Sequence, residues 1–261
     1  MTGLSHRRET GMADRADDTT ADRPDAGKTM ADTTYRRLRH DIVAGKLPAG
    51  AKLKLEGLTA DYAVGMSPLR EALTRLMGDL LVVSEGQRGF WVAPLSLDEL
   101  DDISRVRALI ETEALNAAIR NGDAAWEAAL TRAFDDLSAV EATLPQTAEP
   151  LEPAVLERWE QCNRAFHTAL VAASGSPLLI KLRDLLYQQS ERYRRVSLNV
   201  SRRRRNVHDE HVAIYEAAIA RNALRACRMT ELHLARTAEE VRRAMQELSE
   251  GQAATAEPRR H

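Results

Sequence analysis

Apolar residues recur every three or four positions along most of the chain, the spacing that buries one face of an α-helix. After residue 96 this spacing predicts six successive helices, separated by stops rich in Gly, Pro, Ser and Asn. Helices joined by short connections pack antiparallel, so the pattern predicts an all-α antiparallel six-helix bundle. The six helices are expected at about 97–121, 123–143, 153–173, 177–199, 206–221 and 223–248.

Three short amphipathic segments precede this bundle. They lie at 35–43, 58–62 and 67–76. Two β-prone runs follow, at 81–83 and 89–92, and their spacing is typical of a hairpin. Three helices followed by a two-stranded wing predict a winged helix-turn-helix, so the whole chain is expected to be mainly α.

The third of these segments has the features of a DNA recognition helix. Ser67 is expected to cap its amino end, and Pro68 suits the first helical position. Its leucines share one face, so Arg70 and Arg75 are free to face a partner in the DNA major groove. The alternative is an ordinary surface helix with solvated arginines.

The distribution of charge favours a local rather than a general affinity for nucleic acid. The whole chain has a net charge of −2, but residues 33–95 carry nine Lys and Arg against six acidic residues, a net charge of +3. Because DNA phosphates attract these cations, the amino-terminal part is the expected DNA-binding surface.

Length and composition divide the chain further. At 261 residues, two modest domains are favoured over one, and both ends have too few large apolar side chains to order themselves. The predicted segments are a disordered arm at 1–30, a winged helix-turn-helix at 31–95, a helical domain at 96–249 and a disordered tail at 250–261.

The cysteines and the lengths of the apolar runs indicate where in the cell the protein is expected. The two cysteines, Cys162 and Cys227, are expected to be buried thiols in a reducing environment, with a disulfide or metal pair as the alternative. Without an apolar run long enough for a membrane span or a signal peptide, we expect a cytoplasmic protein with no membrane partner. The four arginines at 202–205 are expected to form a solvated loop rather than a second DNA-binding patch.

Three histidines lie in apolar helical patterns on three different predicted helices. His167, His211 and His233 can therefore converge inside the bundle, where neutral imidazole is a favoured metal ligand. Asn163 lies one helical turn before His167 on the same face. The alternative for each histidine is a hydrogen-bonded core residue.

The amino-terminal motifs are similar to those of a known family. The stretches LPAGAKL, SPLREALTRL and QRGFWV resemble the GntR family of bacterial transcription regulators over about residues 33–95. The resemblance implies a homodimer that binds a palindromic operator in double-stranded DNA. It places DNA contacts at Ser67, Arg70, Arg88 and Gly89.

Two positions depart from this family pattern. Many members have a Ser-Arg pair where this chain has Gly-Met at 65–66, and a basic residue where it has Glu56. The operator of other members therefore does not carry over, and Lys52, Lys54 and Arg75 are expected to compensate.

The second half resembles the FCD effector domain of the FadR branch of the same family. The motifs are VRALIE at 106–111, NRAFH at 163–167, a Glu-His pair at 210–211 and a histidine in the last helix. The resemblance implies a bound divalent metal ion, zinc first, with nickel, manganese or iron as alternatives. Its expected ligands are Asn163, His167, His211 and His233.

The same resemblance implies a small carboxylate effector beside the metal. Arg107 would pair with it, because a guanidinium binds a carboxylate bidentately; the alternative is a salt bridge to Glu111, one helical turn later. Asn163 stands where aspartate is common, which leaves the site one charge more positive. The stretches GMSPLREAL and AFHTALVAASGS are similar to the carbon-starvation-induced, glutarate-responsive type, which favours a dicarboxylate.

These features predict a ligand-responsive, DNA-binding transcription regulator, a repressor released by a carboxylate, and not an enzyme. The alternative is a helical-bundle metalloenzyme fused to a DNA-binding module, since a three-histidine metal with an open position can activate water. The sequence offers no HExxH-type base beside these histidines, which favours the regulator.

Overall fold

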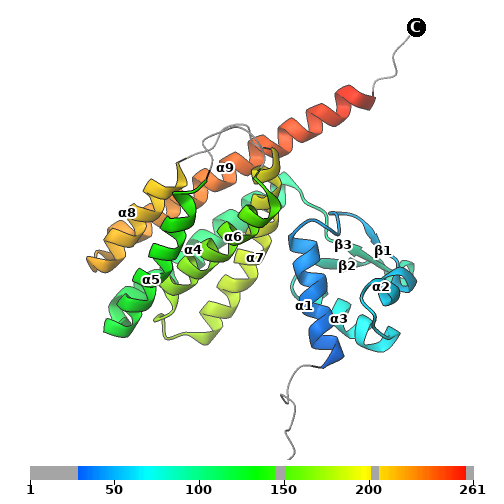
Figure 1. Cartoon of the computed structure of the whole chain (residues 1–261), viewed down its shortest axis with the longest axis horizontal. Coiled ribbons are helices and arrows are strands. Elements are labelled where there is room, and N and C mark those ends of the chain that lie inside the picture. The colour runs from blue at the N-terminus through cyan, green and yellow to red at the C-terminus, as the bar shows by residue number, and fades with distance from the viewer. Residues whose placement is uncertain (1–28, 145–150, 201–205, 257–261) are drawn as a thin grey trace, which may run out of the picture.

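The computed structural model describes residues 29–144, 151–200 and 206–256, which form two units joined by a short linker (Figure 1). The predicted fold class is confirmed, because a small winged helix-turn-helix precedes a bundle of six helices. Most of the predicted arm and the arginine run at 202–205 lie outside the described residues.

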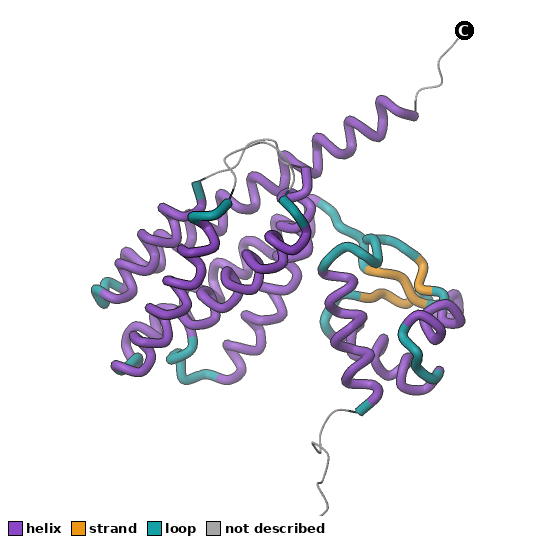
Figure 2. The backbone as a smooth tube through the Cα atoms, viewed as in Figure 1, coloured by secondary structure: helices purple, strands orange, loops and turns teal. Residues whose placement is uncertain are grey.

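The amino-terminal unit packs three helices on a small antiparallel sheet of order β1-β3-β2 (Figure 2). Leu69, Leu73 and Leu76 are fully buried in its core, and each contributes about 1.5–3 kcal/mol by leaving water. Its elements are α1 (Met30–Val43), β1 (Lys52–Leu53), α2 (Leu55–Asp61), α3 (Met66–Gly78), β2 (Val82–Ser84), the 3₁₀ turn η1 (Gly86–Arg88) and β3 (Phe90–Val92).

The recognition helix α3 begins differently from the prediction. Gly65 is its N-cap, with extended backbone at φ −71° and ψ 162°, whereas Ser67 lies inside the first turn. No side chain caps this helix, so the predicted cap at Ser67 is wrong. The reason is the preceding turn: Ala63 has a left-handed φ of 50°, and the chain reaches the extended conformation that a cap needs at Gly65.

The wing also contains a strand that the sequence did not predict. β1 pairs with β3 through Lys52 opposite Trp91 and Leu53 opposite Phe90. A strand of two residues is too short to show an alternation of apolar and polar positions, so only the tertiary pairing reveals it.

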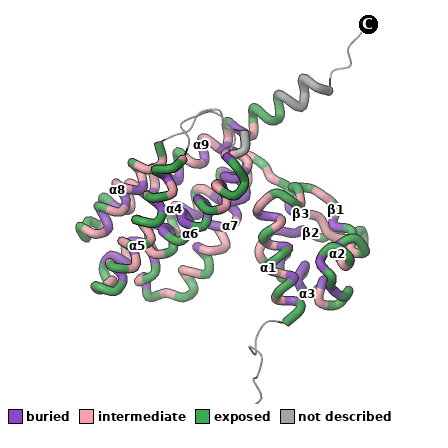
Figure 3. Tube along the Cα trace, in the orientation of Figure 1, coloured by how far each residue is buried: buried purple, intermediate pink, exposed green. Residues whose placement is uncertain are grey.

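The carboxyl-terminal unit is the predicted bundle, and Figure 3 shows buried residues running through its middle. Phe166, Leu130, Leu137 and Ile214 are fully buried there. Of the described helices, none is long and apolar enough to cross a membrane. The bundle consists of α4 (Leu97–Asn121), α5 (Ala124–Glu141), α6 (Pro153–Val171), α7 (Pro177–Val200), α8 (Val207–Ile219) and α9 (Ala223–Ala256).

Two helices extend into segments predicted to be disordered. α1 begins at Met30 because Thr29 and Asp32 form a reciprocal capping box. α9 continues to Ala256, although the sequence predicts an end at residue 248, and its last turns project beyond the bundle (Figure 1). Gly251 lies inside this extension, although glycine is about 1 kcal/mol less favourable than alanine in a helix interior.

Helix α7 joins the two units. Gln189 donates a hydrogen bond of 2.6 Å to the carbonyl of Asp79, and Arg192 donates one of 2.6 Å to the carbonyl of Ala93. Arg39 of α1 donates to the Gln188 side chain at 2.8 Å. The DNA-binding unit is therefore held against the same helix that lines the interior of the bundle.

Candidate metal centre and DNA-binding face

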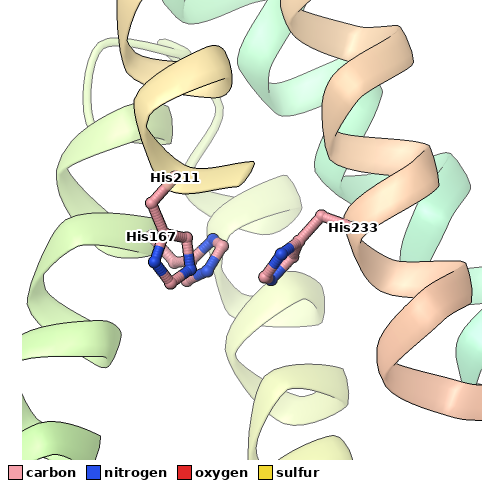
Figure 4. Close-up of side chains that lie close together, drawn as sticks. All are labelled: His167, His211 and His233. Carbon is pink, nitrogen blue, oxygen red and sulfur yellow. The ribbon is translucent and has the colours of Figure 1, made fainter. Parts of the chain in front are cut away.

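Three histidine side chains meet in the bundle from three helices. His167 comes from α6, His211 from α8 and His233 from α9, and their ligand atoms lie within 4.8 Å of one another (Figure 4). All three are buried. The structure thus brings together the histidines that the sequence singled out, and this cluster could hold a metal ion.

Two carboxylates orient this histidine cluster. Nδ1 of His211 lies 2.8 Å from Glu141 Oε1, and Nδ1 of His233 lies 3.0 Å from Glu210 Oε2. A carboxylate that accepts the Nδ1 proton leaves Nε2 as a lone-pair donor, which is the tautomer a metal requires. Burial raises the pKa of Glu141, but hydrogen bonds from His211 and His208 outweigh it, so the pKa is lowered and the carboxylate stays ionised.

Two buried atoms at the site lack a hydrogen-bond partner among the described residues. They are Nε2 of His211 and Oδ1 of Asn163. The amide nitrogen of Asn163 donates to the Tyr187 hydroxyl at 3.0 Å. An unpaired buried acceptor costs about 1–3 kcal/mol. A metal cation can accept lone pairs from both an imidazole nitrogen and an amide oxygen. The residues present therefore fit a divalent metal ion.

His167 is uncharged, as a metal ligand must be. Burial lowers its pKa well below 6.5, and the nearby His233, His211, Arg107 and Arg183 lower it further. His167 is therefore neutral near pH 7, the form that binds a metal.

Arg107 forms the salt bridge to Glu111 that the sequence left open as an alternative to effector binding. It is buried, forms an ion pair of 3.1 Å with Glu111, and donates to the Ser190 hydroxyl at 2.7 Å. Its guanidinium carbon also lies 4.7 Å from the centre of the Tyr187 ring. Arg107 is thus close to the histidine cluster but already has a carboxylate partner.

Sequence reasoning missed three residues at the site, and it named a fourth, Glu210, only as part of a motif. Glu141 and Glu210 orient histidines, while Tyr187 and Arg183 lie on α7 beside Arg107. The only available signal was a polar side chain within an apolar helical stripe, which does not identify its partner.

The predicted DNA-binding residues of the wing and second helix lie on the surface. The Arg88 side chain is 81% exposed, and Lys54 is exposed at the start of α2. Gly89 has a φ of 117°, a conformation that strains any residue with a Cβ atom, so the tip of the wing requires glycine here.

The two arginines of α3 differ in their surroundings. Arg70 is exposed, as is Ser67 near the start of the helix. Arg75 instead forms an ion pair with Asp32, and its guanidinium carbon lies 4.3 Å from the centre of the Tyr35 ring. Arg75 is therefore held against α1, whereas Arg70 points to solvent.

Comparison with known proteins identifies the class to which this fold and site belong. Residues 30–92 match the family described as bacterial regulatory proteins, gntR family, and residues 102–236 match the FCD domain. The chain belongs to the GntR family of DNA-binding transcription regulators, with an amino-terminal helix-turn-helix domain and a carboxyl-terminal FCD domain.

Individual relatives are also transcription regulators by name. The chain is 39% identical over 207 residues to the uncharacterized HTH-type transcriptional regulator BphR of Paraburkholderia xenovorans, covering 79% of this chain and 83% of that protein. It is 36% identical over 209 residues to the HTH-type transcriptional repressor GlaR of Escherichia coli, covering 77% of this chain and 90% of that protein. Among solved structures, E. coli McbR/YncC has a similar fold, with a TM-score of 0.68 at 19% identity over 82% of this chain and 98% of that one.

Proposed function

We propose that this protein is a ligand-responsive repressor that binds a palindromic operator as a homodimer and releases it when a small carboxylate or dicarboxylate enters the helical bundle. The main support is the buried cluster of His167, His211 and His233 beside buried arginines, in a unit that packs against a winged helix-turn-helix. DNA binding alone does not require such a cluster.

The proposed metal ligands are His167, His211, His233 and the side-chain oxygen of Asn163. Zinc suits three imidazoles best, with nickel, manganese and iron as alternatives. When bound, the ion supplies positive charge and an open coordination position for an anion. The neutral state of His167 and the two supporting carboxylates favour this role.

The proposed DNA-binding surface consists of α3 and the wing. Arg70 would read a base in the major groove, and Ser67 would contact a phosphate near the start of α3. Arg88 and Gly89 would bring the wing close to the minor groove, and Lys54 would contact a phosphate. The exposure of Ser67, Arg70, Lys54 and Arg88 supports these roles.

Dimerisation would use the helical unit. Leu109 of α4 is 63% exposed, and Leu178 and Leu182 of α7 are 67% and 41% exposed. Two copies of the chain would remove these exposed leucines from water if the neighbouring helices α4 and α7 formed the dimer interface.

Control would pass through the helices that touch both units. α4 begins at Leu97, soon after the wing, and side chains of α7 donate hydrogen bonds to the carbonyls of Asp79 and Ala93 in the DNA-binding unit. A shift of either helix on effector binding would move each DNA-binding unit relative to its dimer mate and alter the spacing of the half-sites.

The test is a gel-shift titration of metal-loaded protein on the DNA upstream of its own gene. Glutarate, succinate, 2-oxoglutarate and monocarboxylates are added in parallel, with chelated protein as the control. At least one carboxylate should weaken operator binding several-fold to about a hundredfold, which corresponds to a coupling of about 1–3 kcal/mol. If every carboxylate leaves operator affinity unchanged in both directions, the proposed control is wrong.

A further inference from the structure

A second buried arginine in the bundle has an unused hydrogen-bond donor. The Arg183 side chain on α7 is 1% exposed, and its Nη2 has no partner among the described residues. Its other donors are engaged: Nε bonds Glu111 Oε2 at 3.2 Å, and Nη1 bonds the Thr168 hydroxyl at 3.2 Å and Asp184 at 3.0 Å. A guanidinium group forms its strongest hydrogen bonds with carboxylates and phosphates, so the unused donor points to an anionic partner.

The charge around this donor is also incompletely neutralised. Arg107 pairs with Oε1 of Glu111 and Arg183 pairs with Oε2 of the same carboxylate, so one negative charge serves two buried guanidinium groups. The other acid near Arg183, Asp184, is 49% exposed, and water screens its charge. A buried excess of positive charge is unfavourable until an anion neutralises it.

A single tyrosine connects this arginine pair to the histidine cluster. The Tyr187 side chain is fully buried, and the guanidinium carbons of Arg107 and Arg183 lie 4.7 Å and 4.6 Å from its ring centre. The His167 ring lies 6.1 Å from the same ring, centre to centre, and Asn163 donates to its hydroxyl. Thr168, which follows His167 in the sequence, accepts a hydrogen bond from Arg183.

We infer that Arg183 binds a second acidic group of the effector, and that the effector is therefore a dicarboxylate. One carboxylate lies at the histidine cluster, and the other is held by Arg183 together with Arg107. This inference rests on the proposed function, because it assumes that an anion binds beside the histidines. It assigns specificity to Arg183: this residue distinguishes a dicarboxylate from the monocarboxylate of the same length.

The neighbouring arginines of α7 provide a comparison. Arg194 binds both oxygens of Glu160, at 3.0 Å and 2.6 Å, and Arg195 bonds Glu191 at 3.1 Å and Glu157 at 2.9 Å. Arg195 is buried on the same helix and has two carboxylate partners, so it is a matched control.

The experiment is calorimetry on the metal-loaded, full-length protein with pairs of equal length: glutarate against pentanoate and succinate against butyrate. The wild-type protein should bind one dicarboxylate about tenfold to a hundredfold more tightly than its monocarboxylate partner, the range expected for a charge-assisted hydrogen bond. Arg183→Gln should lose most of this preference while its affinity for the monocarboxylate changes little. Arg195→Gln should keep the preference, and Arg183→Lys should keep part of it through its charge.

The outcomes separate this inference from the proposed function. A wild-type protein that binds both members of each pair equally well overturns the inference, whatever the variants do, and leaves a carboxylate effector intact. Retention of the full preference in Arg183→Gln also overturns it, because the second acidic group would then bind without the Arg183 guanidinium. If no carboxylate of either kind binds, both the inference and the proposed effector are wrong.

Discussion

Arg70 and Arg75 lie on one helix, but the structure gives their side chains different surroundings. Arg75 is engaged by Asp32 and the Tyr35 ring, whereas Arg70 forms no ion pair or side-chain hydrogen bond with another described residue. An exposed and unengaged arginine near the start of a recognition helix is suited to base contact.

Replacing Arg70 by Ala should therefore weaken operator binding by about 1–3 kcal/mol if Arg70 reads a base bidentately. Binding by the wild-type protein should also fall steeply with salt, because DNA counterions are released on binding. Fluorescence anisotropy at matched salt measures both effects. Arg75→Ala is the control and should have a smaller effect; equal operator affinity for Arg70→Ala and wild type would mean that another helix reads the DNA.

His167 provides a pH-dependent prediction. Its pKa in the folded chain lies well below 6.5, so below pH 6.5 the unfolded chain binds more protons than the folded chain. The stability that the neutral side chain contributes is present above pH 6.5 and is lost as the pH falls. For metal-free protein, the free energy of unfolding should decline below pH 6.5, and His167→Gln should show a shallower decline in urea titrations.

The exposed His40 supplies the control for this pH series. His40→Gln should leave the decline unchanged. A decline that is equally steep in His167→Gln and wild type would refute the assigned charge state of His167.

At the scale of elements, the histidine cluster links helices that are distant in the sequence. His167, His211 and His233 lie on α6, α8 and α9. A metal that binds only the folded arrangement stabilises it by mass action, by about 2.7 kcal/mol when free metal is a hundredfold above its Kd.

Zinc should therefore raise the thermal unfolding temperature, and chelation should lower it. The double variant His167→Ala/His233→Ala should lose both the bound metal and this response, as read by elemental analysis and calorimetry. His208→Ala is the control, because His208 bonds Glu141 but lies outside the cluster. Full metal occupancy in the double variant would exclude the proposed site.

At the scale of the whole molecule, α7 has one face in the bundle and another against the DNA-binding unit. Tyr187 and Ser190 contact Arg107 inside the bundle, while Gln189 bonds the carbonyl of Asp79. The residues that would sense an effector are thus neighbours, on one helix, of a residue that helps to hold the DNA-binding unit.

Gln189→Ala should consequently reduce the change in operator affinity that an effector causes, while the effector itself binds with little change. In the wild type, the coupling between effector binding and operator binding is expected to be about 1–3 kcal/mol, and the variant should lose part of it. Calorimetry measures the affinity for the effector, and gel-shifts with and without the effector measure the change in operator affinity. Gln161→Ala is the control, because Gln161 is an exposed glutamine on α6. Unchanged coupling in Gln189→Ala would show that this hydrogen bond does not carry the signal, and would leave the contacts of Arg192 and Arg39 and the linker before α4.

Patterns along the chain were enough to predict most of the elements and the cluster of three histidines. The helical period of its apolar residues predicted the six helices of the bundle, and the order of three helices and a hairpin predicted the winged helix-turn-helix. Both signals are local, because they depend on residues a few positions apart. Histidines in apolar stripes indicated a buried imidazole cluster for the same reason.

The partners of these side chains depend instead on how the helices pack. Glu141 lies 70 residues before His211, the two-residue strand β1 exists only through its pairing with β3, and Glu111 is shared by Arg107 and Arg183 from two helices. Such contacts depend on how whole helices pack, and no spacing along the chain encodes them. The start of α3 at Gly65 likewise follows from the conformation of the preceding turn rather than from the side chain of Ser67.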